Sequence, residues 1–146
     1  MNWFALPELV REKVRDECDW HTVAMLDVAL GKHVDLDAYH MNSAASQGHI
    51  NVIKWLRANN CPWSQYTCAH AAEHGHLDVL QWLRANGCPW DVWVCTYAAA
   101  RGHLDMLKWA VAHGCDWSYR AYVLAKAGNH QHVVAWFQSQ WSELWT

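Results

Sequence analysis

The chain has 146 residues, of which 53% are hydrophobic and 17% are charged, and its net charge is −3. This length fits one domain with a substantial core, and this composition excludes intrinsic disorder. The charge argues against a protein that binds nucleic acid by neutralising phosphates. No apolar run reaches the roughly 18 residues of a membrane span, and the N-terminus does not read as a secretory signal. The unusual counts are 12 Trp, 11 His and 6 Cys.

The first predicted element is an amphipathic helix over residues 6–18. Its apolar residues recur at helical spacing with charged residues between them: Leu6, Val10, Val14 and Cys18. One interpretation is an N-terminal cap, since a stack of repeats needs a polar outer face on its first unit. The other is an F-box-like segment over residues 5–30, because Leu6-Pro7 and the apolar residues eight and twelve positions after Leu6 resemble the start of an F-box. That resemblance implies docking onto a ubiquitin ligase.

From residue 23 onward the chain repeats itself every 27 residues, which accounts for the three unusual counts. The residues that keep this step are Trp55, Trp82, Trp109 and Trp136; Trp63, Trp90 and Trp117; Cys61, Cys88 and Cys115; Cys68 and Cys95; and His49, His76, His103 and His130. Residues 48–63 and 75–90 are identical at eleven of sixteen positions. The apolar residues of segment 23–29 align with those of residues 50–56 when the sequence is shifted by 27, so this segment matches the second half of a unit.

Each unit is predicted to fold as two helices. The first helix follows an N-cap residue, which is Asp37, Ser64, Asp91 or Ser118, and runs for about ten residues, as over 65–74. A glycine then ends it in the left-handed conformation, a role that Asn129 takes in the last unit. The second helix, as over 77–85, carries a wide apolar stripe and is followed by a short Cys-Pro-Trp loop in two of the units.

The predicted fold is therefore an all-α solenoid of about five helix-turn-helix hairpins. Residues 1–33 form a divergent N-terminal capping hairpin, residues 34–60, 61–87, 88–114 and 115–140 form repeats, and residues 141–146 form a C-terminal cap in which Trp141, Leu144 and Trp145 fold back. Alanine pairs such as Ala71-Ala72 lie on the first helix of three units and Ala125 alone on that of the last, while bulky residues lie on the second helices. This asymmetry predicts a curved stack with the first helices on the concave side.

The segment Thr67–His76, TCAHAAEHGH, resembles the TPLHxAAxxGH pattern of ankyrin repeats, and the likeness extends over about residues 21–140. Two features depart from that pattern. His70 stands one place later than the ankyrin histidine, and the period is 27 rather than about 33 residues. Since the missing residues fall in the ankyrin finger loop, short loops with little or no strand are expected. This short variant is similar to ankyrin arrays of large DNA viruses and of some algae and protists.

The resemblance implies a protein-binding scaffold without enzymatic activity and a cytoplasmic location, or the host cytosol or nucleus if the chain is viral. The residues favour neither a metal nor a cofactor. Cys61 and Cys68 lie seven residues apart with His70 and His74 nearby, and no CxxC pair accompanies the two histidines at finger spacing. Cysteines that keep the repeat phase are better explained as small buried residues in a reducing compartment. The in-phase histidines are predicted to bond backbone at the turn, and no GxSxG or phosphate-binding loop occurs.

Positions that differ between copies are the candidates for partner binding. On the first helix these predict a patch made of Tyr66, His70, Glu73, His74, Trp93, Tyr97, Arg101 and Arg120. Such residue types are enriched in binding hot spots. The alternative is that Trp93 and Tyr97 only pack against loops. The sequence thus predicts a monomer that binds a protein on its concave face, with a ubiquitin-ligase component as the alternative partner, and that binds neither nucleic acid nor membrane.

Overall fold

The computed structural model describes residues 36–144, with side chains up to residue 142. The chain divides into two units, residues 1–36 and 37–146, and the second unit is described here by itself. The predicted capping hairpin of residues 1–33 and the F-box-like segment of residues 5–30 lie outside the described residues. Both interpretations of that segment therefore stay predictions.

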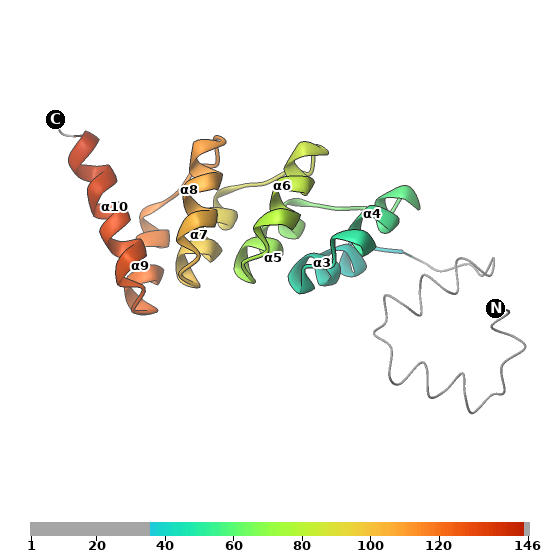
Figure 1. Cartoon of the computed structure of the whole chain (residues 1–146), viewed down its shortest axis with the longest axis horizontal. Coiled ribbons are helices and arrows are strands. Elements are labelled where there is room, and N and C mark those ends of the chain that lie inside the picture. The colour runs from blue at the N-terminus through green and yellow to red at the C-terminus, as the bar shows by residue number, and fades with distance from the viewer. Residues whose placement is uncertain (1–35, 145–146) are drawn as a thin grey trace, which may run out of the picture. The chain divides into compact units, whose positions relative to one another are not determined.

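The described residues form eight α-helices and no strand (Figure 1). They are α3 (Ala38–Gln47), α4 (Ile50–Ala58), α5 (Gln65–Glu73), α6 (Leu77–Ala85), α7 (Val92–Ala100), α8 (Leu104–Ala112), α9 (Tyr119–Ala127) and α10 (Gln131–Leu144). We call α3, α5, α7 and α9 the first helices and the other four the second helices. Every first helix and every second helix begins 27 residues after the previous one of its kind. The prediction of an all-α solenoid of hairpins is confirmed for these residues.

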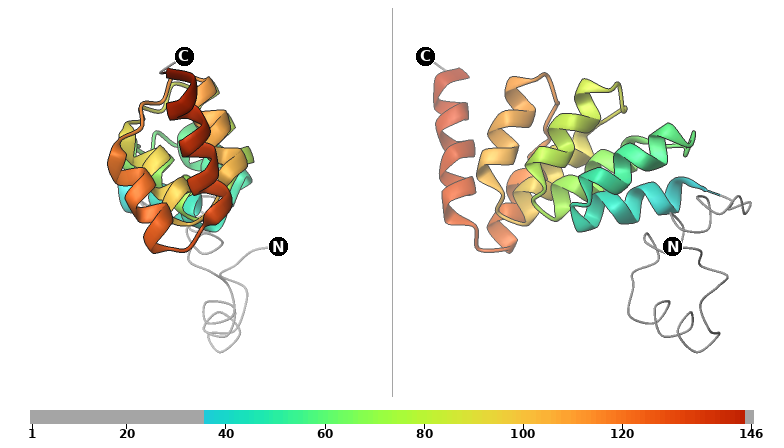
Figure 2. Two further views of the ribbon diagram at one scale, coloured as in Figure 1. Left: turned by 90° about the vertical axis from the view of Figure 1, so that its left-hand side faces the viewer. Right: turned by 45° about the vertical axis from the view of Figure 1, so that its right-hand side comes forward.

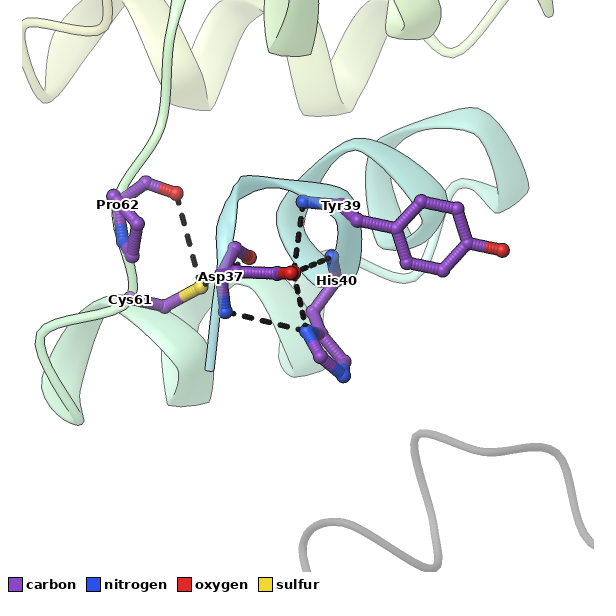
Figure 3. A network of polar contacts seen from close by, with 5 residues as sticks. All are labelled: Asp37, Tyr39, His40, Cys61 and Pro62. Atoms are coloured by element: carbon purple, nitrogen blue, oxygen red, sulfur yellow. Dashed lines mark hydrogen bonds and ion pairs between the residues drawn. The ribbon is translucent and has the colours of Figure 1, made fainter. Parts of the chain in front are cut away.

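The first helices begin where the sequence predicts. The Asp37 carboxylate accepts hydrogen bonds from the backbone N–H groups of Tyr39 (3.0 Å) and His40 (3.3 Å), as Figure 3 shows. Ser64 and Asp91 accept in the same way from the residue two places on. Each cap satisfies a donor that the helix itself leaves unpaired. Ser118 holds the same position in front of α9 without a side-chain cap bond.

The turn between the two helices of a hairpin also connects that hairpin to the next one. Gly75 has φ +79°, and the imidazole of His103, one repeat later, lies so close that a Cβ on Gly75 would meet its Cε1 at 2.8 Å. The same ring donates a hydrogen bond from Nε2 to the Glu73 carbonyl oxygen at 3.2 Å. His76 and His130 make the equivalent bonds at 3.0 Å. The predicted backbone bond is confirmed for these three histidines, and its acceptor belongs to the preceding hairpin.

A second connection between hairpins comes from the cysteines. The Cys61 thiol donates to the carbonyl oxygen of Asp37 at 3.2 Å (Figure 3). Cys88 and Cys115 repeat this contact with the N-cap residue 24 positions before them, at 3.6 and 3.3 Å. All five cysteines of the described residues are free and buried. The prediction that the in-phase cysteines serve as small buried residues is confirmed.

A third connection joins the loops through arginine and tryptophan. The Arg84 guanidinium lies 4.2 Å from the ring centre of Trp90 and donates a hydrogen bond to the Cys88 carbonyl oxygen at 2.6 Å. Trp90 in turn meets Trp109 edge to face at 5.9 Å. Arg57, Trp63 and Trp82 form the same set one hairpin earlier. These contacts hold the short loops in place where no strand is available.

The core contains small residues from the first helices and large ones from the second. The buried alanines of the first helices include Ala44, Ala45, Ala71, Ala72, Ala98 and Ala99. Consequently α5 packs closely between α3 and α7, and α7 between α5 and α9, whereas no two second helices approach as closely. The right-hand view of Figure 2 shows the hairpins following one another along the stack. Closer spacing of the first helices is what the predicted curvature requires.

The last helix differs from the other second helices. α10 has 14 residues where α4, α6 and α8 have 9, and it continues without a break to Leu144. The boundary predicted between residues 140 and 141 therefore does not fall at a helix end, because apolar residues keep helical spacing past it. No helix of the described range is long and apolar enough to cross a membrane.

Candidate functional site

The exposed large hydrophobic side chains of the described residues all lie on first helices. They are Tyr39 (70% exposed), Tyr66 (55%), Tyr119 (66%) and Val123 (44%). The large hydrophobic residues that the structure describes on the second helices are buried or half-buried instead. An exposed aromatic side chain has apolar area to offer a partner, so this side of the stack is the candidate site.

One row of this site runs along the N-terminal ends of the first helices. Its members stand two residues after each N-cap, one per hairpin: Tyr39, Tyr66, Trp93 and Arg120. Because the first helices pack side by side, these four side chains belong to one continuous surface. The Tyr39 ring points away from the cap network of Asp37 in Figure 3.

Trp93, Tyr97 and Arg120 form an aromatic and cationic cluster within that surface. The rings of Trp93 and Tyr97 stack with centres 5.5 Å apart, and the Arg120 guanidinium of the next hairpin lies 5.0 Å from the Trp93 ring centre. Both rings are half-buried and Arg120 is exposed. Tyr97 thus stacks on Trp93 within α7, Arg120 contacts the Trp93 ring from α9, and both aromatic residues stay partly exposed.

Glu73 and Arg101 form the second cluster, at the C-terminal ends of α5 and α7. The guanidinium Nη2 lies 2.7 Å from Glu73 Oε1, and His70 Nδ1 lies 3.9 Å from the other carboxylate oxygen. The hydrogen bond from Arg101 holds the pKa of Glu73 below its ordinary value, against the opposing effect of burial. Arg101 remains 60% exposed, so a partner can still reach its guanidinium.

The structure brings six of the eight predicted residues into these two clusters. Of the other two, Tyr66 stands exposed in the row, and His74 Nδ1 donates to the His70 carbonyl oxygen of its own helix at 3.1 Å. Sequence reasoning missed Tyr39, which lines a shallow open depression between α3 and α5 together with Asn42, Ser43, Ser46 and His70. The signal was available, because Tyr39 precedes Tyr66 by one period of 27 residues.

The side chains of this surface carry groups that make noncovalent contacts. It offers phenol and indole rings, two guanidinium groups, imidazoles and the small polar side chains of α3. Among the described residues, no three His, Cys, Asp or Glu side chains come together as a metal site. Rings and guanidinium groups held by stacking and ion pairing bind other molecules through their faces and N–H groups.

Comparison with known proteins agrees with the fold. The model of the family described as ankyrin repeats (many copies) matches residues 68–111, which extend from α5 into α8. No curated protein matches the chain. The resemblance noted from Thr67–His76 is thereby confirmed, while the likeness to the short arrays of viruses, algae and protists stays a prediction.

Proposed function

We propose that this chain, whose residues 68–111 belong to the ankyrin-repeat family, is a non-enzymatic protein that binds a protein partner through its first helices. Ankyrin repeats generally mediate protein–protein interaction and are typically without catalytic activity. The proposed binding surface, called the first-helix surface, consists of Tyr39, Tyr66, His70, Glu73, His74, Trp93, Tyr97, Arg101 and Arg120.

The observation that carries this proposal is the exposure of tyrosines on the first helices. Tyr39 and Tyr66 are more than half exposed although each sits on a helix that also carries fully buried residues. Hydration of the apolar surface of an exposed aromatic side chain is unfavourable, so covering that surface with a partner lowers the free energy. Tyr, Trp and Arg are also the residue types that dominate hot spots.

The mechanism is rigid presentation. The first helices are fixed by close packing with one another, and the side chains of the two clusters are ordered by mutual contacts across hairpins. A partner that docks on such a surface orders few groups on this side, so little conformational entropy is lost on association. Specificity then comes from the residues that differ between copies.

The test is affinity capture with paired variants. The double variant Tyr66→Ala and Trp93→Ala removes two rings of the first-helix surface, and the control Lys54→Ala and Lys108→Ala alters two exposed residues of second helices. We expect quantitative mass spectrometry to show partners that the control retains and the double variant loses, while both keep the same melting temperature. Equal capture by both variants would contradict the proposal. A third bait without residues 1–19 separates the alternatives, because an F-box-like adaptor would lose ligase components and keep its target.

A further inference from the structure

No residue of the described range covers the side of α9 that faces away from α7. Val123 stands in phase with Ala69 and Thr96, which are 2% and 1% exposed because the next first helix covers them, whereas Val123 is 44% exposed. That this position faces the following hairpin is seen at α3, where Asn42 accepts a hydrogen bond from Thr67 of α5 at 2.7 Å. Lys126 and Tyr119 are exposed on the same side.

The residues of this side differ from those of the interior helices. Where α7 has Cys95, Thr96 and Ala99, α9 has Tyr122, Val123 and Lys126. Small side chains allow the close parallel packing of α5, α7 and α9, and bulky ones prevent it. The end of α9 is therefore poorly shaped for one more first helix of the same kind.

Tyr119, Val123 and Lys126 lie at helical positions i, i+4 and i+7 and so share one stripe of α9, which we call the end stripe. The Tyr119 ring contacts the rings of Tyr122 and Trp141, at centre distances of 5.6 and 6.1 Å, yet 66% of the residue is exposed. No carboxylate whose side chain the structure describes forms an ion pair with Lys126. The stripe thus has an ordered ring at one end, a cation at the other and an apolar residue between them.

We propose that a second copy of this chain covers the end stripe, with the two α9 helices antiparallel about a twofold axis between Tyr122 and Val123. This arrangement places Lys126 of each copy over the Tyr119 ring of the other, where a cation and an aromatic face attract each other. The two Val123 side chains meet beside the axis. In a contact between two identical surfaces, the surface must complement itself. The end stripe meets this condition only when the two helices are antiparallel, because the cation at one end then faces the ring at the other end of its copy.

The proposed contact is separate from the first-helix surface and does not depend on the proposed function. It departs from the monomer predicted from the sequence. Because each copy contributes little more than one nine-residue helix, the interface falls in the small size class of transient complexes. Dimers are therefore expected to form reversibly and to increase with protein concentration.

The first test is the molar mass of the full chain, measured by sedimentation equilibrium from micromolar to millimolar concentration. We expect the mass of the wild type to rise from one toward two chains, and Val123→Glu to stay monomeric because it sets two carboxylates side by side at the axis. Ala112→Glu, an exposed second-helix position, is the matched control and should dimerise like the wild type. A wild type that stays monomeric throughout, or a Val123→Glu variant that dimerises equally, overturns the proposal.

The second test locates the axis by cross-linking. In a Cys18→Ser background, Val123→Cys should form a disulfide-linked dimer with oxidised glutathione, because the two positions 123 meet beside the axis while the five described native thiols are buried. Ala127→Cys is the control on the same helix. With a rise of about 1.5 Å per residue, the two positions 127 of the dimer lie roughly 13 Å apart along the direction of the α9 helices. Equal cross-linking of both variants, or none at position 123, overturns the antiparallel arrangement.

Discussion

The interior hairpins and the terminal hairpin are built on the same 27-residue plan but are stabilised differently. In the interior, Arg84 covers Trp90 from the hairpin before it, and small residues such as Thr96 are covered by the hairpin after it. In the terminal hairpin, Val111 stands in the place of that arginine, and Trp117 packs on Phe137 and Trp141 at 5.0 and 6.1 Å. The comparison teaches that an interior hairpin takes one partner of each such contact from its neighbour. The last hairpin instead makes these contacts between its own aromatic residues.

The largest expected effect is on that aromatic cluster. Phe137 is fully buried and stands in phase with Leu83 and Ala110. Phe137→Ala should lower the free energy of unfolding by about 3–5 kcal/mol, because it leaves a cavity that α10 cannot close. Phe137→Leu, which installs the interior side chain, should lower it by only about 1–2 kcal/mol. Urea denaturation measures both. Equal unfolding midpoints for the wild type and the alanine variant would show that the cluster does not hold the end of the stack.

The next effect tests the turns that join interior hairpins. Gly75 and Gly87 both have positive φ, at +79° and +81°, but only Gly75 lies against a histidine ring of the next hairpin. Gly87→Ala should lower the free energy of unfolding by about 1 kcal/mol, the strain of a left-handed alanine. Gly75→Ala adds a clash with His103 and should lower it by about 3 kcal/mol. Thermal unfolding of the two variants gives the difference, and identical losses would mean that the ring moves aside without effect.

A smaller effect is expected from the arginine–tryptophan contact. Arg84→Ala removes the guanidinium from the Trp90 ring and its hydrogen bond to Cys88, and should lower the free energy of unfolding by about 1–2 kcal/mol. Arg84→Lys keeps a charge but not the planar group and should recover less than half of the loss. Chemical denaturation followed by tryptophan fluorescence reports both variants. Full recovery by lysine would assign the effect to charge alone.

The smallest effect concerns the ion pair between α5 and α7. Because Arg101 lowers the pKa of Glu73, the carboxylate stabilises the fold above the ordinary unfolded pKa of about 4.3. That contribution is lost as the pH falls through the lower pKa of the folded state. It should stay below about 1 kcal/mol, since Arg101 is 60% exposed. NMR titration should show the Glu73 pKa rising in Arg101→Gln, and an unchanged titration would refute the pairing in solution.

Much of the fold could be predicted because the residues that recur every 27 positions are also the ones that cap and end the helices. The second helix over 77–85 was predicted at its observed bounds, and Asp37, Ser64 and Asp91 act as the caps that their residue types suggest. What period alone cannot give is the partner of a contact. His103 could be assigned to backbone bonding from its phase, but the acceptor at Glu73, thirty residues back, follows from the distance between hairpins in space.

The candidate site could be predicted in part. The variable positions of α5 and α7 identified Tyr66, Trp93 and Arg101, because differences between copies can be read directly from the sequence. Tyr39 was missed because the unit over 34–60 was not included in that comparison. The end stripe was missed for a physical reason: Val123 has the phase of a buried residue, but among the described residues no first helix follows α9 to cover it.

The histidine at the turn has a consequence for how such a chain can lengthen. The α5–α6 and α7–α8 hairpins each contain both the imidazole that bonds backward and the glycine and carbonyl that receive the imidazole of the next hairpin. A tandem duplication of 81 nucleotides, one period of 27 codons, would therefore create a new junction with both halves of the contact already present. Point mutations at either half would instead disrupt a junction. Growth and loss of whole units is thus the path of least disruption for the evolution of this chain.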